Sequence, residues 1–540
     1  MKPTVRFFLL GALSALFFVL AFPPYGFVPL AFVGLVPFLW AVEAASTAKK
    51  AAWVGAGAMI SYVLFGFGWV SYVAVSFGGF PWIVGKIVLV LFALFAELQF
   101  VAFAIVARVL VKNVRPTTFG FLSFVVMLSS IYVAFDWWYP KIFPNTLGHS
   151  LIAWFSVVQI AEFTGAYGLT FLIIAFNASV YFLLRRRHMR VAAITAGALI
   201  LLFLGFGIWG NHRITQLQAL ERSFSREFRF SVIQANIGDA EKLESESGFA
   251  RAIYRVLDTY REMTIDAVKK RPDTDLLIWA ETAFPLLYLH FDNPIADQSS
   301  IGGRSYIKNV AREAGKPLYF GGYAARGKRD YNSAFLLNSD GKILDYYHKS
   351  ILLAFGEYVP LGPFSSYIQD LVPAIADFGR GAGPMIMSLP LSERDHVRLA
   401  PQICYEGLVP EFSRRSVRDG ADVLINITND SWFGDTSEPH QHLGLTRFRS
   451  IELRRPMIRA TNTGISAVLG LSGDLNFQTP LFQPTVMQGT IRLPGPEQKF
   501  PSTFYARLGE VFAHFASVVA LVFLLRNIKT IGRRLRLGRR

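Results

Sequence analysis

Three residue types in this 540-residue sequence could together carry out acyl transfer: a thiol, a carboxylate and an ammonium group. Cys404 is the only cysteine, so it cannot form a disulfide within the chain and is either an inert core residue or a nucleophile. Glu281 ends the apolar run DLLIWAE, and Lys349 follows the pattern of a β-hairpin. A carboxylate can take the thiol proton, and an ammonium group can stabilise the negative charge that develops during attack on a carbonyl group.

Two of these residues also have an ordinary structural explanation. A strand-terminal carboxylate such as Glu281 can cap a helix, and an isolated cysteine such as Cys404 is more often a buried small side chain than a nucleophile. Both residues end predicted strands, however, and active sites of open α/β sheets collect at the carboxyl ends of the strands. Their shared position therefore favours a common site.

The composition indicates a membrane protein. Hydrophobic residues make up 52% of the chain and charged residues only 17%, which is too apolar for a soluble enzyme. A membrane-spanning helix needs about 20 apolar residues, and about eight runs approach that length. The runs are 5–22, 27–44, 52–75, 82–107, 117–135, 158–184, 191–209 and 507–525. The second is interrupted by Pro29 and Pro37, and the first lacks a cleavage site, so we expect no removable signal peptide.

Basic residues predict the orientation of these helices. Lys and Arg precede the first run, follow the even-numbered runs and fill the C-terminal tail, whereas the exits of the odd-numbered runs carry almost none. By the positive-inside rule, both termini are cytoplasmic and the polar block after the seventh run lies on the opposite side of the membrane. The same pattern explains the formal net charge of +16 better than nucleic-acid binding does, because the charges lie in short groups beside apolar runs.

The long polar block predicts a folded α/β domain. We expect a transmembrane domain at 1–211, a catalytic domain at 212–500, and a C-terminal helix with a basic tail at 501–540. Within the block, β-branched or aromatic runs alternate with helical patterns, which is typical of a layered α/β fold. The predicted strands are 228–236, 275–281, 317–324, two hairpin strands around the turn 339–341, 398–406, 421–428 and a pair within 457–471. The predicted helices are 246–270, 304–315 and 438–455.

Several motifs resemble those of the nitrilase superfamily of carbon–nitrogen hydrolases, and most closely its membrane-bound branch, the apolipoprotein N-acyltransferases. The motifs are QANI at 234–237, WAETAFP at 279–285, YNSAFLL at 331–337, HKSILLAFGEYVP at 348–360, ICYEGLVPEF at 403–412, NITNDSWFG at 426–434 and RRPMIRATNTGISAV at 454–468. The resemblance extends over nearly the whole chain. It implies a multi-pass α-helical membrane domain joined to an α/β nitrilase-like domain, an αββα sandwich, on the periplasmic side of a bacterial inner membrane.

The resemblance assigns a role to each residue of the thiol, carboxylate and ammonium set. It implies that Glu281 is the general base, Lys349 the stabiliser of the oxyanion and Cys404 the nucleophile. A neighbouring ammonium group such as Lys349 would favour the thiolate of Cys404. The implied reaction has two steps: the thiol takes an acyl chain from a phospholipid, usually phosphatidylethanolamine, and the thioester passes it to the α-amino group of the diacylglyceryl-cysteine of an apolipoprotein.

Other positions of the family pattern concern the surroundings of the site. The resemblance implies that Glu357 braces the lysine and the acid–base pair, and that Tyr405 and Glu406, directly after the nucleophile, help to handle the substrate. The chain departs from the family at Leu243, where the family often carries a tryptophan.

Two other functions remain open from the residues themselves. Water in place of the amine would make the protein a membrane-tethered amidase or nitrilase, and a fold without catalysis would make it a lipid-binding scaffold. We expect no cofactor and no metal site, because His440 and His442 are two residues apart on different faces of a helix. We also expect a monomer whose partners are a phospholipid donor, diacylated apolipoproteins and the lipid bilayer.

Two further features could serve function or structure. The segments 284–294 and 361–378 are too apolar for ordinary surface loops, so at least one is expected to form a mobile arm or lid that dips into the membrane, unless both pack on the core. Glu97 and Glu162 lie within apolar runs and either face the interior of the helical bundle in a functional role or lie near an interface.

Overall fold

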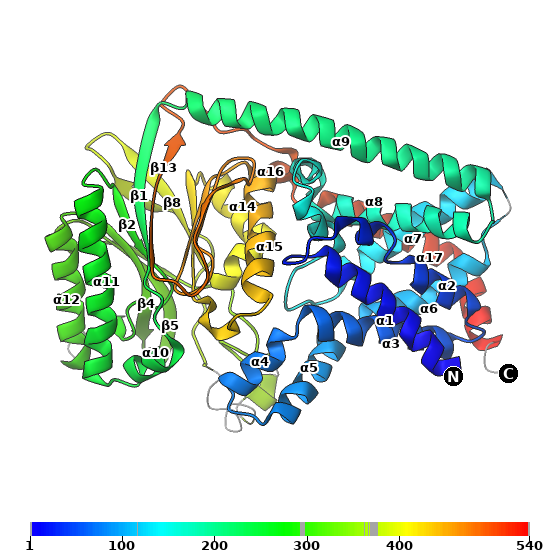
Figure 1. Cartoon of the computed structure of the whole chain (residues 1–540), viewed down its shortest axis with the longest axis horizontal. Coiled ribbons are helices and arrows are strands. Elements are labelled where there is room, and N and C mark those ends of the chain that lie inside the picture. The colour runs from blue at the N-terminus through cyan, green and yellow to red at the C-terminus, as the bar shows by residue number, and fades with distance from the viewer. Residues whose placement is uncertain are drawn as a thin grey trace. The chain divides into compact units, whose positions relative to one another are not determined.

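The computed structural model describes residues 3–115, 117–291, 298–360, 362–365, 367 and 376–537. The chain forms two compact units, one of Met1–Thr215 with Thr503–Arg540 and the other of Gln216–Ser502 (Figure 1). Helix α9 (Met189–Ser223) continues from the first unit into the second, and the two units are described in turn.

The first unit is helical. Its elements are α1 (Pro3–Ala21), η1 (Val28–Phe32), α2 (Val36–Ala44), α3 (Ala48–Gly66), α4 (Trp69–Ser76), α5 (Trp82–Ala96), α6 (Gln99–Lys112), α7 (Thr118–Trp138), η2 (Leu147–Ala153), η3 (Val157–Ile160), α8 (Ala161–Leu184), α9 (Met189–Ser223), α16 (Phe504–Leu508) and α17 (Val511–Leu537). Each of the predicted apolar runs coincides with a helix or with consecutive helices of this unit.

Several of these helices are long and apolar enough to cross a membrane. Among the described residues, four segments pass by length and composition: Thr4–Ala21, Thr118–Trp138, Val157–Leu184 and Met189–Ser223. Two bent pairs pass together, α3 with α4 at 59° and α5 with α6 at 50°, which gives up to six spans. The remaining two predicted runs form the shorter apolar helices Val28–Ala44 and Val511–Arg526. Pro29 and Pro37 lie at the starts of η1 and α2, where a missing N–H is tolerated, and so divide the second run.

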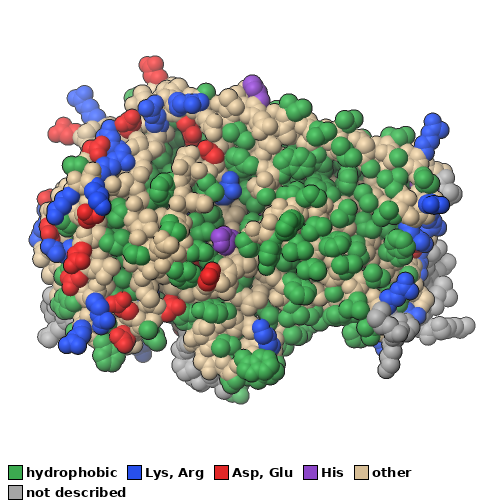
Figure 2. Space-filling view, in the orientation of Figure 1, with side chains coloured by type: hydrophobic (Ala, Val, Ile, Leu, Met, Phe, Trp, Pro, Cys, Tyr) green, Lys and Arg blue, Asp and Glu red, His purple; other side chains and the backbone are tan. Residues whose placement is uncertain are grey.

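Glycines let two helices of this unit pack closely. A Cβ on Gly57 of α3 would lie 2.0 Å from the carbonyl oxygen of Phe8, and a Cβ on Gly11 of α1 would lie 2.0 Å from that of Val54. Small residues at helix contacts are the usual means by which membrane helices approach one another. Figure 2 shows hydrophobic side chains gathered over the surface of this unit, and Leu201 is 70% exposed, as lipid-facing side chains are.

The two carboxylates within the apolar runs are both buried and both have partners. Glu162 forms an ion pair with Arg213, whose Nη2 lies 3.1 Å from its Oε2. Glu97 lies at the bend between α5 and α6, and its Oε2 accepts a hydrogen bond from Gln99 Nε2 at 2.7 Å. Both therefore face the interior of the unit, as an ionisable group in an apolar helix must.

The second unit contains two mixed β-sheets. The first has the order β13-β1-β2-β4-β5-β6, with β3 also paired to β4, and the second has the order β12-β11-β10-β9-β8-β7. The strands are β1 (Arg226–Gln234), β2 (Leu276–Trp279), β3 (Leu287–His290), β4 (Leu318–Arg326), β5 (Arg329–Leu337), β6 (Ile343–His348), β7 (Met387–Pro390), β8 (His396–Ile403), β9 (Val423–Thr428), β10 (Met457–Thr461), β11 (Ala467–Leu469), β12 (Leu475–Gln478) and β13 (Thr485–Leu493). Parallel pairing joins β1 to β2 to β4 in the first sheet and β8 to β9 to β10 in the second.

Helices cover the outer faces of both sheets. They are α10 (Asp239–Glu246), α11 (Ala250–Lys270), α12 (Gln298–Ala314), α14 (Pro410–Arg418) and α15 (Glu438–Leu453), with short turns η4 (Gly362–Phe364), η5 (Cys404–Leu408) and η6 (Asp430–Phe433). In Figure 1, α11 and α12 lie on one outer side and α14 and α15 on the other, with the two sheets between them. One apolar core joins the sheets, including Phe230 and Ile278 from the first and Leu399 and Ile425 from the second. The predicted αββα sandwich is confirmed.

The two apolar segments expected to supply a lid have different outcomes. In the first, Phe284, Leu286 and Tyr288 are buried in the core beneath the first sheet, and β3 pairs with β4. The described part of this segment therefore packs on the core and does not form a lid. The second, 361–378, lies largely outside the described residues, so its role as a lid stays a prediction.

Candidate active site

Strand β8 delivers the nucleophile candidate at the start of a sharp turn. Its last residues are fully buried, and Cys404 begins η5 directly after them with a φ of 50°. A non-glycine residue in this left-handed region is strained, and such strain is typical of functional sites that hold one side chain forward. The amide of Asn426 holds the turn, because its Nδ2 donates to the carbonyl oxygen of Cys404 at 3.1 Å.

Glu406 locks the nucleophile turn to the loop that follows β6. Its Oε2 accepts from the backbone N–H of Ile403 at 2.8 Å, and its Oε1 accepts from the hydroxyl of Tyr347 at 2.5 Å and from the N–H groups of Ser350 and Ile351 at 2.7 and 3.1 Å. The side chain is fully buried. These contacts indicate that Glu406 positions the nucleophile turn.

The carboxylate of Glu281 is placed by a second strained turn, after β2. Thr282 has a φ of 48°, and the chain turns over Gly321, where a Cβ would lie 2.6 Å from the Glu281 Cα. Only glycine fits such a close approach of two backbones. The backbone N–H of Asn429, which follows β9 in the second sheet, donates to Glu281 Oε2 at 2.8 Å. Glu281 is thus held between the two sheets.

Lys349 lies between two carboxylates at the end of β6. Its Nζ is 2.8 Å from Glu357 Oε1 and 3.5 Å from Glu281 Oε1, and the lysine is 1% exposed. The amide of Asn332, in β5, bridges the same two oxygens, with its Nδ2 at 2.8 Å from that of Glu281 and 3.1 Å from that of Glu357. The structure therefore brings together the predicted Glu281, Lys349 and Glu357.

The charges of this group affect the protonation of both lysine and cysteine. Burial lowers the pKa of Lys349, but Glu357 and Glu281 outweigh it and hold the pKa above its ordinary value, so the ammonium form persists. Burial and the Glu281 carboxylate raise the pKa of the Cys404 thiol well above its usual value, although Lys349 and a hydrogen bond with Thr428 act in the opposite direction. Lys349 thus favours the thiolate of Cys404, in the direction that the sequence predicts, but desolvation and the nearby carboxylate have the larger effect on the pKa of the thiol. The thiol must lose its proton to a base when it attacks.

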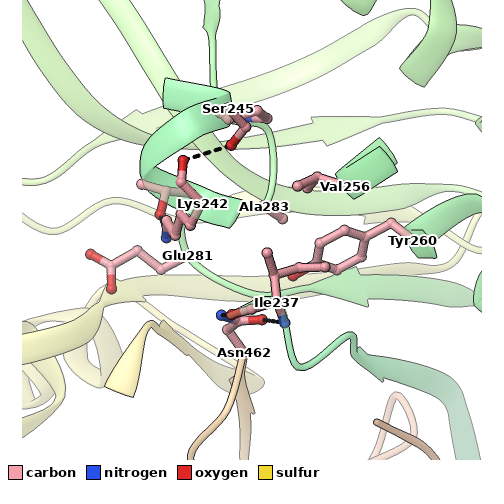
Figure 3. Close-up of a pocket in the computed structure, with 10 residues that line it drawn as sticks. Ile237, Lys242, Ser245, Val256, Tyr260, Glu281, Ala283 and Asn462 are labelled. Atoms are coloured by element: carbon pink, nitrogen blue, oxygen red, sulfur yellow. Dashed lines mark hydrogen bonds between the residues drawn. The ribbon is translucent and has the colours of Figure 1, made fainter. Parts of the chain in front are cut away.

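The other predicted site residues are less central. Tyr405 follows Cys404 and is half-buried, and burial raises its pKa. Leu243 is 65% exposed on α10, so it faces away from the core. Asn332 was not predicted from the sequence, because a polar residue within a strand is expected to lie on the face of the sheet that is exposed to solvent. Nor was Lys242, which is buried and lines a pocket beside Glu281 (Figure 3).

One cluster behind the site has the residue types of a metal site. Among the described residues, Asp430, Glu438 and His442 are the group whose ligand atoms come together, with His442 Nδ1 3.5 Å from Asp430 Oδ1 and 3.4 Å from Glu438 Oε1. Arg459 Nη2 lies 2.8 Å from Asp430 Oδ2. Burial and Arg459 lower the pKa of His442, but its two carboxylate neighbours raise it overall. Arg459 pairs with Asp430, and His442 lies between the two carboxylates, so these buried groups are partners of one another.

The bridging amide of Asn332 gives a testable consequence. Asn332→Ala removes the two hydrogen bonds that hold Glu281 and Glu357 at their present separation, so we expect the rate of the acyl transfer predicted from the sequence to fall by about 10- to 100-fold while the protein stays folded. The measurement is the initial rate of product formation together with a melting curve. Asn338→Ala is the matched control: Asn338 caps the turn between β5 and β6 through Asp340 and Lys342, so its loss should lower stability slightly and leave the rate unchanged. A rate within twofold of wild type for Asn332→Ala would contradict this role.

Comparison with protein families assigns each unit a class. The family model described as carbon-nitrogen hydrolase matches residues 230–498. The family model described as apolipoprotein N-acyltransferase N-terminal domain matches residues 14–179. The protein therefore combines a nitrilase-like domain of the carbon–nitrogen hydrolase class with an N-terminal helical domain that carries several apolar candidate spans.

Curated relatives narrow this class to one family. An apolipoprotein N-acyltransferase of Bdellovibrio bacteriovorus is 34% identical over 93% of this chain and 89% of its own length, and one of Geobacter metallireducens is 31% identical over 97% and 96%. Among solved structures, an amidase from Nesterenkonia sp. is similar, with a TM-score of 0.36 and 18% identity over 54% of this chain and 98% of that chain. The chain belongs to the apolipoprotein N-acyltransferase family. This membership, the nitrilase-like fold and the apolar helices support an acyltransferase enzyme of a membrane.

Proposed function

We propose that this protein transfers an acyl chain from a membrane phospholipid, through a thioester on Cys404, to the α-amino group of the N-terminal diacylglyceryl-cysteine of apolipoproteins. The observation that carries the proposal is the meeting of one carboxylate, one ammonium group and the only thiol at the ends of three strands from two sheets. Phosphatidylethanolamine is the proposed donor. The family name of the relatives supports the apolipoprotein acceptor.

In the first step, Cys404 takes the acyl chain from the ester. Glu281 accepts the thiol proton as the sulfur attacks the ester carbonyl carbon, which avoids a free thiolate in a site where burial disfavours one. Lys349 stabilises the oxyanion of the tetrahedral intermediate. When this intermediate collapses, the ester C–O bond breaks, and the lysophospholipid leaves with the proton that Glu281 had received.

In the second step, the acceptor amine releases the enzyme. The amine attacks the thioester carbonyl carbon, Glu281 takes its proton, and the C–S bond breaks as the amide forms. The proton then returns to the sulfur of Cys404. Donor and acceptor react in turn at one sulfur, which is a ping-pong mechanism. Glu357 and Asn332 keep Lys349 and Glu281 in place through both steps.

The helical unit gives this chemistry its location. Both proposed substrates are anchored in lipid, and a catalytic domain tethered to the same membrane meets them at high local concentration. We propose that the protein is a monomer of the bacterial inner membrane, with residues 212–500 in the periplasm and both termini in the cytoplasm. The distribution of basic residues beside the apolar runs supports this orientation.

A reconstitution assay tests the proposed function against its alternatives. Purified protein is incubated with phosphatidylethanolamine and a diacylglyceryl-cysteine peptide, and the peptide mass is measured. A gain of one acyl chain on the peptide supports the transferase. Release of free fatty acid without peptide acylation would instead identify a hydrolase, and binding of lipid without either product would identify a non-catalytic scaffold.

Single cysteines test the orientation. In the Cys404→Ala background, Asn309→Cys on α12 and Lys49→Cys at the start of α3 each add one exposed thiol. In cells whose outer membrane has been opened, a membrane-impermeant maleimide should label the protein with Asn309→Cys, whereas the protein with Lys49→Cys should react only after the inner membrane is broken. The reverse pattern would place the catalytic domain in the cytoplasm and exclude the proposed location.

A further inference from the structure

A second buried lysine lies beside the proposed base. Lys242 belongs to α10, is only 7% exposed, and extends from that helix toward Glu281 (Figure 3). Its Nζ donates to the hydroxyl of Thr282. With the side-chain amide of Asn429 turned so that both ends meet matching partners, Nζ also donates to the Asn429 oxygen at 2.8 Å. An ammonium group is rarely buried to this extent without a specific purpose.

The two partners of Lys242 are the residues that set the position of Glu281. Thr282 follows Glu281 in the chain and adopts the strained φ of 48° that turns the carboxylate into the site. Asn429 donates its backbone N–H to Glu281 Oε2 at 2.8 Å. A single ammonium group therefore ties the end of β2 in the first sheet to the end of β9 in the second, on either side of the carboxylate.

Lys242 also adds a second cation to a site that contains two carboxylates. Glu281 and Glu357 contribute two negative charges, and Lys349 offsets only one of them. Moving the Cys404 proton onto Glu281 leaves a negative sulfur beside the remaining carboxylate. Lys242 is close enough to interact electrostatically with both Glu281 and Cys404. Burial lowers the pKa of Lys242, whereas Glu246, Glu281, Asp239 and Cys404 act in the opposite direction, so an ammonium group here opposes the build-up of negative charge on the carboxylates and the sulfur.

We propose that Lys242 is a positioning residue and the second cation of the Cys404 site: it holds the Glu281 turn against Asn429 and offsets the negative charge that appears when the thiol loses its proton. This role rests on the proposed function only in taking Cys404 as the reactive group. Leu243, its neighbour on the opposite, exposed face of α10, has no part in it.

Alkylation of Cys404 tests this role without any lipid substrate. Because Cys404 is the only thiol, the rate of iodoacetamide incorporation into the full-length protein in detergent can be followed by intact mass between about pH 6 and pH 10. In the wild type, the rate should rise with pH through the alkaline range, because burial and Glu281 raise the pKa of the thiol. In Lys242→Met and Lys242→Gln, this rise should move upward by about one pH unit, a rate about tenfold lower at a given pH.

Three comparisons separate charge from packing. Lys242→Gln keeps a hydrogen-bond donor but no charge, Thr282→Val keeps the charge but removes one acceptor, and Leu243→Ala changes only the exposed face. The two Lys242 variants should shift alike, Thr282→Val should stay within about threefold of wild type, and Leu243→Ala should match wild type. If Lys242→Met fails to fold, Lys242→Gln carries the test alone. A wild-type profile in Lys242→Gln overturns the proposal. Failure of the peptide-acylation assay would leave this result standing, since alkylation needs neither acyl donor nor acceptor.

Discussion

Cys404→Ala is expected to abolish both half-reactions. The chain has no other thiol, and no acyl-enzyme can form without the sulfur, so labelling of the protein by a phospholipid with a radioactive acyl chain should disappear. The rate of peptide acylation should fall by at least about 10⁴-fold, as it does when the nucleophile of a comparable acyl-transfer enzyme is removed. The measurements are protein-bound radioactivity after denaturation and the mass of the acceptor peptide.

Folding controls make the loss of labelling interpretable. Cys404 is half-buried and its side chain is small, so the alanine variant should lose no more than about 1 kcal/mol of stability. Cys404→Ser nearly keeps the volume of the side chain and its hydrogen-bonding group. The serine hydroxyl is a much weaker nucleophile than a thiol, so this variant should be almost as inactive as Cys404→Ala. Retained labelling in the alanine variant would mean that another side chain carries the acyl group, and the mechanism would have to be discarded.

The membrane helices were predictable because the length of a span follows from the thickness of the bilayer. Each predicted apolar run forms a helix or a helix pair. The sharp bends between α3 and α4 and between α5 and α6 were not predictable, since residues on both sides of each break are equally apolar. Such a bend depends on what packs against the break, which is information from distant parts of the chain.

The strands that carry the site were predictable for a similar local reason. Glu281 and Cys404 each end a run of apolar residues, and a charged or reactive group at such a position stands out. Strand β13 was missed because its sequence alternates without a continuous apolar run, and it is identified only by its antiparallel pairing with β1. Lys242 was missed because the segment DAEKLESE reads as a solvated helix, and only the packing of α10 over the turn at Thr282 buries its ammonium group.

The protonation of the site shows what sequence spacing cannot supply. Lysine near cysteine suggests a thiolate, but the pKa of the thiol depends on the sum of all nearby charges and on burial. Glu281 lies beside Lys349, and its carboxylate raises the pKa of the Cys404 thiol whereas the ammonium group lowers it. Such a balance is a property of three-dimensional packing. It favours attack in which a base takes the thiol proton as the sulfur reacts.

Lys349→Met should have the second large effect, on catalysis and stability together. The substitution removes the proposed oxyanion stabiliser, so the rate should fall by about 10³-fold or more. It also removes the cation that lies between the buried Glu281 and the partly buried Glu357, which should cost about 3–5 kcal/mol of folding free energy. Peptide acylation and denaturant unfolding measure the two effects separately.

Combining Lys349→Met with Glu357→Gln distinguishes the two roles of the lysine. A neutral amide at position 357 removes the carboxylate that has lost its closest cation, so the double variant should be more stable than Lys349→Met alone, with a coupling energy of about 1–3 kcal/mol. Its activity should remain as low as that of the single lysine variant, because the oxyanion still lacks its ammonium partner. Recovery of activity along with stability would mean that Lys349 serves only to neutralise Glu357, and another group would then have to stabilise the tetrahedral intermediate. Strictly additive stabilities would show that the two side chains do not form a coupled pair, although their atoms lie 2.8 Å apart.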